Sequence, residues 1–424
     1  MKYENPQADS DTLKWSEPLL WFTMAISCIV FIEPAPYDFM LILLFVLLYS
    51  YRLRVPGEIA VPALLLALFT AGNLVGALVS GEPDVTVRPL VTRIYMALSW
   101  LLFVSIIVSA TEKNMRIIWS GYTVAALFAA VWGCLEYYDL MPAFIVGDAF
   151  GRAKGPFKDP NVFGPFLIPI AIYLLSRMLK ARHTQFFIEA AKFLVIAFGI
   201  LLSFSRGAWL NFGIALASYM LLSIATTPSL REKIRLTIIV GIVTLVSGAT
   251  LTWAVNNTAA GQRFFDRAKI FKQYDIETGG RFHTQAMALE EVGSRPLGIG
   301  PGMSTPEIGM EPHNLFLHAA LEGGWLGAVA FGLFLVQALY RAIGRIGMRW
   351  PLQSDLHVVL AVLLGTLFQS LFIDSTHWRH LWLLLAMIWG LTIAVDRATL
   401  AHGSAVMLKN LRYQGGSGLR NQSG

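Results

Sequence analysis

The sequence predicts an all-α polytopic membrane protein with about twelve transmembrane helices, and two observations carry this prediction. Hydrophobic residues make up 55% of the 424 residues and charged residues only 14%, whereas soluble proteins contain about 25% charged residues. The apolar residues also fall into runs of about twenty, which is the length that one helix needs to cross a bilayer. The net charge of +6 therefore does not indicate nucleic-acid binding. The positions of the charged residues along the chain are more informative than their sum.

Twelve apolar runs are candidate spans, although the second is short. They are residues 18–33, 37–51, 58–80, 90–110, 115–138, 161–180, 185–203, 207–226, 234–255, 313–340, 354–374 and 378–396. This divides the chain into residues 1–255 with spans 1 to 9, a loop at 256–312, residues 313–396 with spans 10 to 12, and a tail at 397–424. The Gly/Ser-rich end of the tail predicts disorder.

Lysine and arginine predict the orientation, because they concentrate in cytoplasmic loops. If the N-terminus lies in the cytoplasm, every even-numbered loop carries a basic cluster, and this side holds 20 of the 33 basic residues. Both termini are then cytoplasmic, and the 256–312 loop lies on the opposite face. Neither Cys28 nor Cys134 indicates a disulfide or a metal site, because each lies in an apolar run.

The other thirteen basic residues lie on the far face, where the orientation rule does not explain them. Five are singled out as candidate site residues: Arg88, Arg93, Arg206 and Arg281, which lie at or near far-face helix ends, and Lys158. The alternative for each is a lipid-headgroup anchor.

The 256–312 loop predicts some structure of its own. The pattern RFFDRAKIFKQY (263–274) indicates either a helix lying in the membrane interface or a solvated helix. GGRFHTQAMALEEV predicts a second helix that begins near Arg281. SRPLGIGPG is a turn and not a phosphate loop, because no Gly-Lys-Ser/Thr follows it.

A histidine stands at the predicted start of the tenth span, in EPHNLFLHAALEGGWLG (311–327). His313 follows Pro312, and proline favours the first turn of a helix. A helix N-terminus and neighbouring arginines both disfavour a protonated imidazole. A neutral imidazole can accept a proton near pH 7, so His313 is a candidate site residue.

Supporting roles are predicted for several polar residues near span ends. Asn314, and Asp159 with Asn161, have the side chains that cap or orient helix starts. Glu322 is interpreted as a buried carboxylate paired with another helix, and Gly323 and Gly324 predict a bend there. FIDSTHWRHLW (372–382) adds Arg379 or His377 to the rim of the site.

Four motifs occur in one order along roughly residues 80–380. They are GPFKDPNVFGPFL (155–167), SFSRGAWL (203–210), GGRFHTQAMALEEVGSRPLGIGPG (279–302) and EPHNLFLHAALEGGWLG (311–327). Together they resemble the O-antigen ligase and polysaccharide polymerase superfamily. The chain is most similar to the ligase branch, because it is compact and has no large C-terminal periplasmic domain.

The resemblance implies a GT-C-like glycosyltransferase without a metal or other cofactor, located in the bacterial inner membrane. Its donor is a polysaccharide on undecaprenyl diphosphate, and its acceptor is a sugar hydroxyl of lipid A–core on the periplasmic face. The five cations then hold the diphosphate, a role that suits arginine because its planar fork binds phosphate oxygens in pairs and stays charged. His313 is then the general base that deprotonates the acceptor hydroxyl, or alternatively a residue that only hydrogen-bonds a phosphate or a sugar. Transfer inverts the anomeric carbon.

Other functions stay open. A polymerase and a protein O-oligosaccharyltransferase belong to the same superfamily, and sequence barely separates them from a ligase. A transporter or flippase is the alternative from another class. Transporters often place ionisable groups near the membrane midplane and contain internal repeats, whereas here the unusual charges gather at one face and no repeat is evident.

Overall fold

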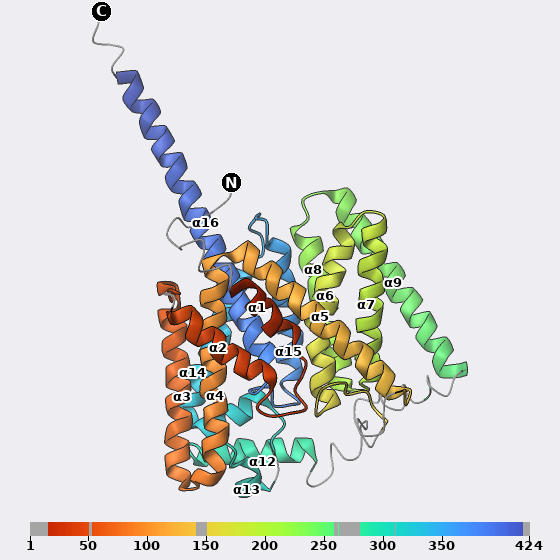
Figure 1. Cartoon of the computed structure of the whole chain (residues 1–424), viewed down its shortest axis with the longest axis vertical. Helices are drawn as coiled ribbons and strands as arrows, with labels where there is room; N and C mark the ends of the chain where they lie inside the picture. Colours follow the sequence, from red (N-terminus) through yellow and green to blue (C-terminus); the bar gives the residue numbers. More distant parts are fainter. Residues whose placement is uncertain are drawn as a thin grey trace, which may run out of the picture.

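The computed structural model describes residues 16–50, 53–140, 151–257, 262, 280–309 and 311–418, and its regular structure is helical. The helices are α1 (Ser16–Ala25), α2 (Pro36–Ser50), α3 (Ala60–Ser80), α4 (Pro83–Ser109), α5 (Thr111–Tyr137), α6 (Pro160–Lys180), α7 (Thr184–Leu202), α8 (Arg206–Thr226), α9 (Leu230–Asn257), α12 (Arg281–Ser294), α13 (Ser304–Ile308), α14 (Leu315–Ile343), α15 (Gln353–Gln369) and α16 (Arg379–Gly418). A short 3-10 turn, η1 (Gly57–Ile59), precedes α3. Most of these helices run roughly along one common direction (Figure 1).

The helices support a multi-pass membrane protein, and each predicted span overlaps one of them. In the described part of the chain, eight segments are long and apolar enough to cross a membrane: η1 with α3, α4, α5, α6, α7, α8, α14, and the first part of α16 as far as Ala401. Helices α2 and α15 are apolar but shorter. The number twelve therefore stays a prediction.

Two element predictions need correction. The predicted boundary at 397 is not a helix end, because α16 continues as far as Gly418, and alanine, leucine and lysine in this stretch favour a helix. The helix of the tenth span begins at Leu315 and not at His313. The predicted helix at Arg281 is confirmed as α12, whereas the predicted helix at 263–274 lies outside the described residues.

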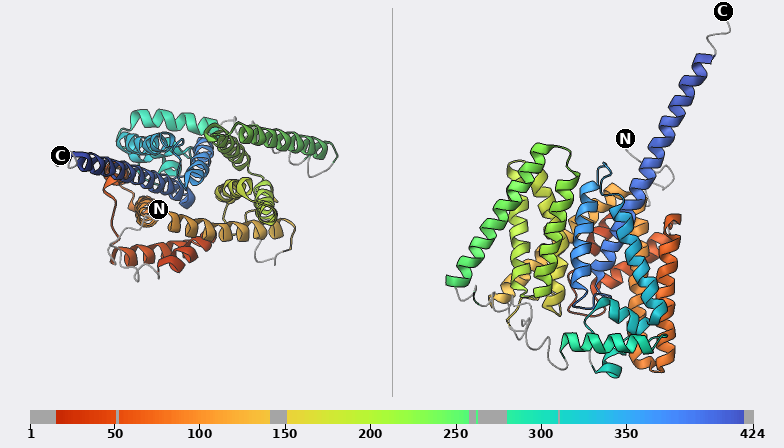
Figure 2. Two further views of the ribbon diagram at one scale, coloured as in Figure 1. Left: turned by 90° about the horizontal axis from the view of Figure 1, so that it is seen from above. Right: turned by 180° about the vertical axis from the view of Figure 1, so that it is seen from behind.

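The connections alternate between the two ends of the bundle. Those between α4 and α5, α6 and α7, α8 and α9, and α14 and α15 lie at the upper end of Figure 1. The α3–α4 connection lies at the lower end with α12 and α13, and the view from behind shows the same separation (Figure 2). Which end faces the cytoplasm stays a prediction from the basic residues.

Close packing of α3 against α14 fixes the position of the helix that follows the His313 turn. A Cβ on Gly72 would lie 2.5 Å from the carbonyl oxygen of Gly323, and one on Gly76 would lie 2.4 Å from that of Glu322. Small residues at these positions let two membrane helices approach closely. The middle of α14 is therefore held against α3 with little freedom to shift.

Candidate functional site

The turn before α14 presents His313 at the lower end of the bundle. Asn314 is the N-cap of α14, and its side chain accepts hydrogen bonds from the backbone N–H of Phe316 (2.9 Å) and Leu317 (3.1 Å). The backbone N–H of Leu315 donates to the carbonyl of Ser370 (2.8 Å), just after α15. His313 therefore lies one residue outside the cap, is only partly exposed, and has a φ of +46°.

Helix α12 is tied to this turn. Gln285 donates from its side chain to the carbonyl of His313 (3.3 Å) and to that of Leu371 (3.0 Å). Asn314 donates to the same Leu371 carbonyl (3.1 Å). Arg281 is one helical turn before Gln285 and shares its face of α12. Two predicted site residues, Arg281 and His313, are thus brought together.

The pKa of His313 is lowered from its ordinary value. Partial burial of the imidazole is the main cause, and the positive charge of Arg281 acts in the same direction. Glu311 and Asp374 oppose the shift and His318 reinforces it. The direction and the effect of a neighbouring arginine agree with the prediction, whereas burial takes the place of the helix N-terminus as a cause, since His313 lies outside the helix.

Arg206 begins α8, after the N-cap residue Ser205, whose side chain accepts from the backbone N–H of Ala208 (3.3 Å). A Cβ on Gly207 would lie 3.0 Å from Nε2 of Gln369, the last residue of α15. The next residue, Ser370, accepts from Leu315 at the start of α14. The starts of α8 and α14 therefore both adjoin the end of α15.

Arg93 is buried inside the bundle and forms an ion pair with Glu322 of α14, as the predicted pairing of Glu322 with another helix requires. The exposed fractions of the two side chains are 6% and 0%. Arg93 also donates to the side-chain oxygen of Asn73 on α3. Its charge is neutralised inside the protein, so Arg93 differs in setting from the other predicted phosphate ligands.

Glu322 also holds a glycine-rich loop in place. Its carboxylate accepts from the backbone N–H of Gly302 (2.7 Å) and from the hydroxyl of Ser304 (3.3 Å). Its backbone carbonyl accepts from Gly300 (3.2 Å). The predicted bend follows at Gly324, where φ is +63°. The loop that joins α12 to α13 is therefore anchored on the kink of α14.

His318 joins this buried group to the surface turn. Its Nε2 lies 2.9 Å from a carboxylate oxygen of Glu311 and 3.4 Å from one of Glu322, and its Nδ1 lies 3.5 Å from Oδ2 of Asp374. Burial acts to raise the pKa of Glu311, but the hydrogen bond and charge of His318 outweigh it and lower that pKa. Asp374 behaves likewise: burial opposes ionisation, yet His318 and then His377 hold its pKa well below its usual range.

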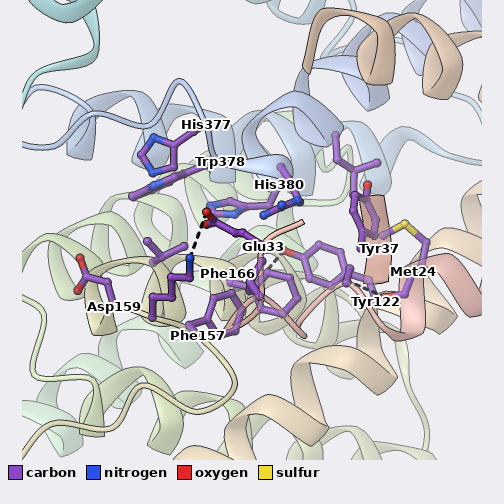
Figure 3. A pocket seen from close by; sticks show the side chains of 16 residues that line it. Met24, Glu33, Tyr37, Tyr122, Phe157, Asp159, Phe166, His377, Trp378 and His380 are labelled. Carbon is purple, nitrogen blue, oxygen red and sulfur yellow. Dashed lines mark hydrogen bonds and ion pairs between the residues drawn. The ribbon is translucent and has the colours of Figure 1, made fainter. Parts of the chain in front are cut away.

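Arg88 and Lys158 lie at a different place, on either side of one carboxylate. Nη2 of Arg88 is 2.9 Å from Oε2 of Glu33, and Nζ of Lys158 is 3.1 Å from the same oxygen. Glu33 and Lys158 line a cavity of about 200 Å³, together with Asp159 and His377 (Figure 3). Asp159 is the N-cap of α6 and accepts from Asn161 (2.8 Å), as predicted.

The sequence interpretation missed Glu311 and the central His318 near the His313 turn, and it missed Glu33 at the cavity. One signal was present in the sequence, since His318 and Glu322 are four residues apart and so share one helix face. No sequence pattern linked Glu33 to Arg88, because they come from separate segments. Arg379 and His377, the two alternatives predicted for the rim, both line the cavity, and Arg379 also donates to Asp38 at 2.7 Å and 2.6 Å.

Within the described ranges, no group of three or more His, Cys, Asp or Glu side chains is arranged to hold a metal ion. The prediction that the protein needs no cofactor remains a prediction.

The helices and the polar groups at one end define a multi-pass membrane protein with an ionisable site at the ends of its spans. The sequence model of a family described as O-antigen ligase matches residues 191–332. This match confirms the resemblance to the O-antigen ligase superfamily, and it contains Arg206, Arg281, His313 and Glu322. No curated protein matches the chain.

Proposed function

We propose that the protein is an O-antigen ligase, which transfers a polysaccharide from undecaprenyl diphosphate to a sugar hydroxyl of lipid A–core at the periplasmic face of the inner membrane. The observation that carries this proposal is that the charge of Arg281 acts on His313 and, with partial burial, lowers its pKa, inside the segment that matches the O-antigen ligase family. A neutral imidazole beside a cation suits a reaction that needs both a base and an anion-binding group.

In this proposal His313 accepts the proton of the acceptor hydroxyl. The hydroxyl oxygen attacks the anomeric carbon of the donor sugar from the side opposite the diphosphate. The bond between that carbon and the phosphate oxygen breaks, its electron pair stays on the leaving diphosphate, and the configuration inverts. Arg281 and Arg206 offset the negative charge that develops on the diphosphate, which is a task that arginine performs without proton transfer.

Replacing His313 tests the base directly. Purified protein, lipid-linked donor and lipid A–core are mixed, and the product is measured as the shift of core to long-chain material. We expect His313→Ala to lose transfer by about 100-fold or more, the lower range for removal of a general base. His313→Asn keeps a hydrogen-bonding side chain that tolerates positive φ, and it is expected to be equally inactive.

His183 provides a matched control. It is exposed, precedes an apolar helix and has a φ of +44°, but it lies before α7 at the other end of the bundle. His183→Ala should transfer normally. Full activity of His313→Ala would refute the catalytic role, whereas full activity of His313→Asn alone would assign His313 to hydrogen bonding instead of proton transfer.

The related functions give different products in cells. Loss of a ligase leaves lipid A–core without long chains while lipid-linked polymer accumulates. Accumulation of single lipid-linked repeat units would indicate a polymerase instead, and modified protein as the product would indicate an O-oligosaccharyltransferase. Transfer between defined substrates without a gradient or ATP would exclude a transporter.

A further inference from the structure

The backbone of His313 has a conformation that neighbouring contacts must hold in place. Its φ of +46° is uncommon for a residue other than glycine, and such conformations persist only where the surrounding structure fixes them. The residues after His313 are fixed by the Asn314 cap and by the hydrogen bond from Leu315 to Ser370. On the preceding side, Glu311 makes the contacts that tie the turn to two helices.

Glu311 joins these two helices at the lower end of the bundle. Its Oε2 lies 2.9 Å from Nε2 of His318 on α14, and its Oε1 accepts from the hydroxyl of Thr305 on α13 (3.1 Å). An ionised carboxylate only accepts, so Nε2 of His318 carries the hydrogen of this bond. Pro312 separates Glu311 from His313; it is buried, and its ring fixes its own φ. The position of the Glu311 carboxylate therefore limits where His313 can lie.

His318 can hold Glu311 because other groups fix the imidazole ring. Its side chain is only 9% exposed. Nε2 also lies 3.4 Å from Oε1 of Glu322, while Nδ1 lies 3.5 Å from Oδ2 of Asp374 and 3.4 Å from Nη2 of Arg93. These three ionisable groups come from α14, from the segment after α15 and from α4. The imidazole is therefore a fixed point inside the bundle to which the surface turn is attached.

We propose that Glu311 and His318 are positioning residues, which clamp the turn so that His313 presents its imidazole to the acceptor hydroxyl in one orientation. This inference rests on the proposed function, because the two residues act through His313 and not on a reacting atom. A general base works only within hydrogen-bond reach of the proton that it accepts. A displacement of about 1 Å can lower a rate by about 100-fold, so a clamp beside the base controls the rate.

Two substitutions at Glu311 separate position from charge. Glu311→Ala removes both contacts. In Glu311→Gln the amide oxygen can accept from His318 and the amide nitrogen can donate to the hydroxyl of Thr305, but the charge is lost. We expect Glu311→Ala to lower kcat for transfer by about 10- to 100-fold, with KM for the acceptor nearly unchanged, and Glu311→Gln to recover most of that kcat. Both variants should unfold close to the temperature of the unaltered protein, because Glu311 is 41% exposed and exposed ion pairs add little stability.

The pH profile reports the charge of Glu311 separately from its position. Burial and the charges of Arg281 and His318 lower the pKa of His313, whereas Glu311 and Asp374 oppose this shift. Loss of the Glu311 charge lowers that pKa further, so the acid side of the kcat/KM profile should move to lower pH in both variants. The plateau at higher pH should differ between them, because only Glu311→Gln keeps the contacts.

Glu307→Ala is the matched control. Glu307 lies on α13 four residues before Glu311, its side chain is 36% exposed, and it pairs with Arg295 (3.0 Å). Hydrogen exchange, followed by mass spectrometry on the full chain in detergent, gives a second measurement that needs no transfer. The backbone N–H of Leu315 is bonded to Ser370 across the turn. It should exchange severalfold faster in Glu311→Ala than in Glu307→Ala.

The inference is overturned if Glu311→Ala changes kcat and hydrogen exchange no more than Glu307→Ala does. It is also overturned if Glu311→Gln is as impaired as Glu311→Ala, because the charge and not the position would then be required. An unaltered protein without transfer would contradict the proposed function, and hydrogen exchange would still show whether the clamp holds the turn. The two failures are therefore distinguishable.

Discussion

Arg88 and Arg93 lie five residues apart on α4, but the side chain of Arg88 is exposed and that of Arg93 is buried. Arg88 is 78% exposed and pairs with an exposed carboxylate at the mouth of a cavity. Arg93 is 6% exposed and pairs with Glu322, which is fully buried. From sequence the two arginines looked equivalent, as candidate phosphate ligands near one helix end. The comparison teaches that burial decides whether a cation is available to a ligand or is used within the fold.

The largest loss of stability should follow from replacing the buried Arg93. Arg93→Met leaves the Glu322 carboxylate without its partner in the protein interior, and breaking such a pair costs about 3–5 kcal/mol. We expect a clearly lower unfolding temperature in detergent, measured by the fluorescence of a thiol or tryptophan probe. The double variant Arg93→Met/Glu322→Gln removes the uncompensated charge and should recover part of the loss.

A single variant as stable as the unaltered protein would show that Glu322 finds another partner or takes up a proton. In that case the distinction between the two arginines would fail. Equal unfolding temperatures for the single and double variants would indicate that packing of the arginine stem, and not charge, explains the loss.

A smaller effect is expected from replacing Arg281, whose positive charge helps to lower the pKa of His313. A base must be deprotonated, and a lowered pKa means that transfer persists below the ordinary histidine value of 6.5. Arg281→Gln removes one cause of the shift, so the acid side of the pH profile of kcat/KM should move upward toward that value. Residual transfer is measured between pH 5 and 8 with detergent and substrate fixed.

An unchanged profile in Arg281→Gln would mean that burial alone lowers the pKa of His313. A profile that moved to lower pH would contradict the arrangement described for the two residues. His283→Gln is a suitable control, since His283 is exposed on the same helix two residues further on.

The smallest effect should come from Arg88→Gln. Exposed ion pairs contribute about 0–1 kcal/mol, so the unfolding temperature should stay close to that of the unaltered protein, in contrast to Arg93→Met. Any effect of this variant should appear in ligand binding instead. A destabilisation as large as that of Arg93→Met would show that the two arginines do not differ in the way their burial indicates.

The sequence indicated much of the fold because apolar runs and basic clusters are local signals. Each predicted span overlaps a helix, and α12 begins at Arg281 as predicted. The capping roles of Asn314 and Asp159 also followed from residue type and position. The first residue of α14 did not, because the turn at His313 depends on contacts with α12 and with Leu371.

By itself the sequence determined which segments favour a membrane, which residues cap helices, and which ionisable groups lie near helix ends, since these properties depend on neighbours within a few turns. Only the tertiary structure decided that Arg93 pairs with Glu322, that His318 lies among Glu311, Glu322 and Asp374, and that Glu33 separates Arg88 from Lys158. These contacts join residues that are distant along the chain. Their partners are therefore chosen by helix packing and burial, which no local pattern records.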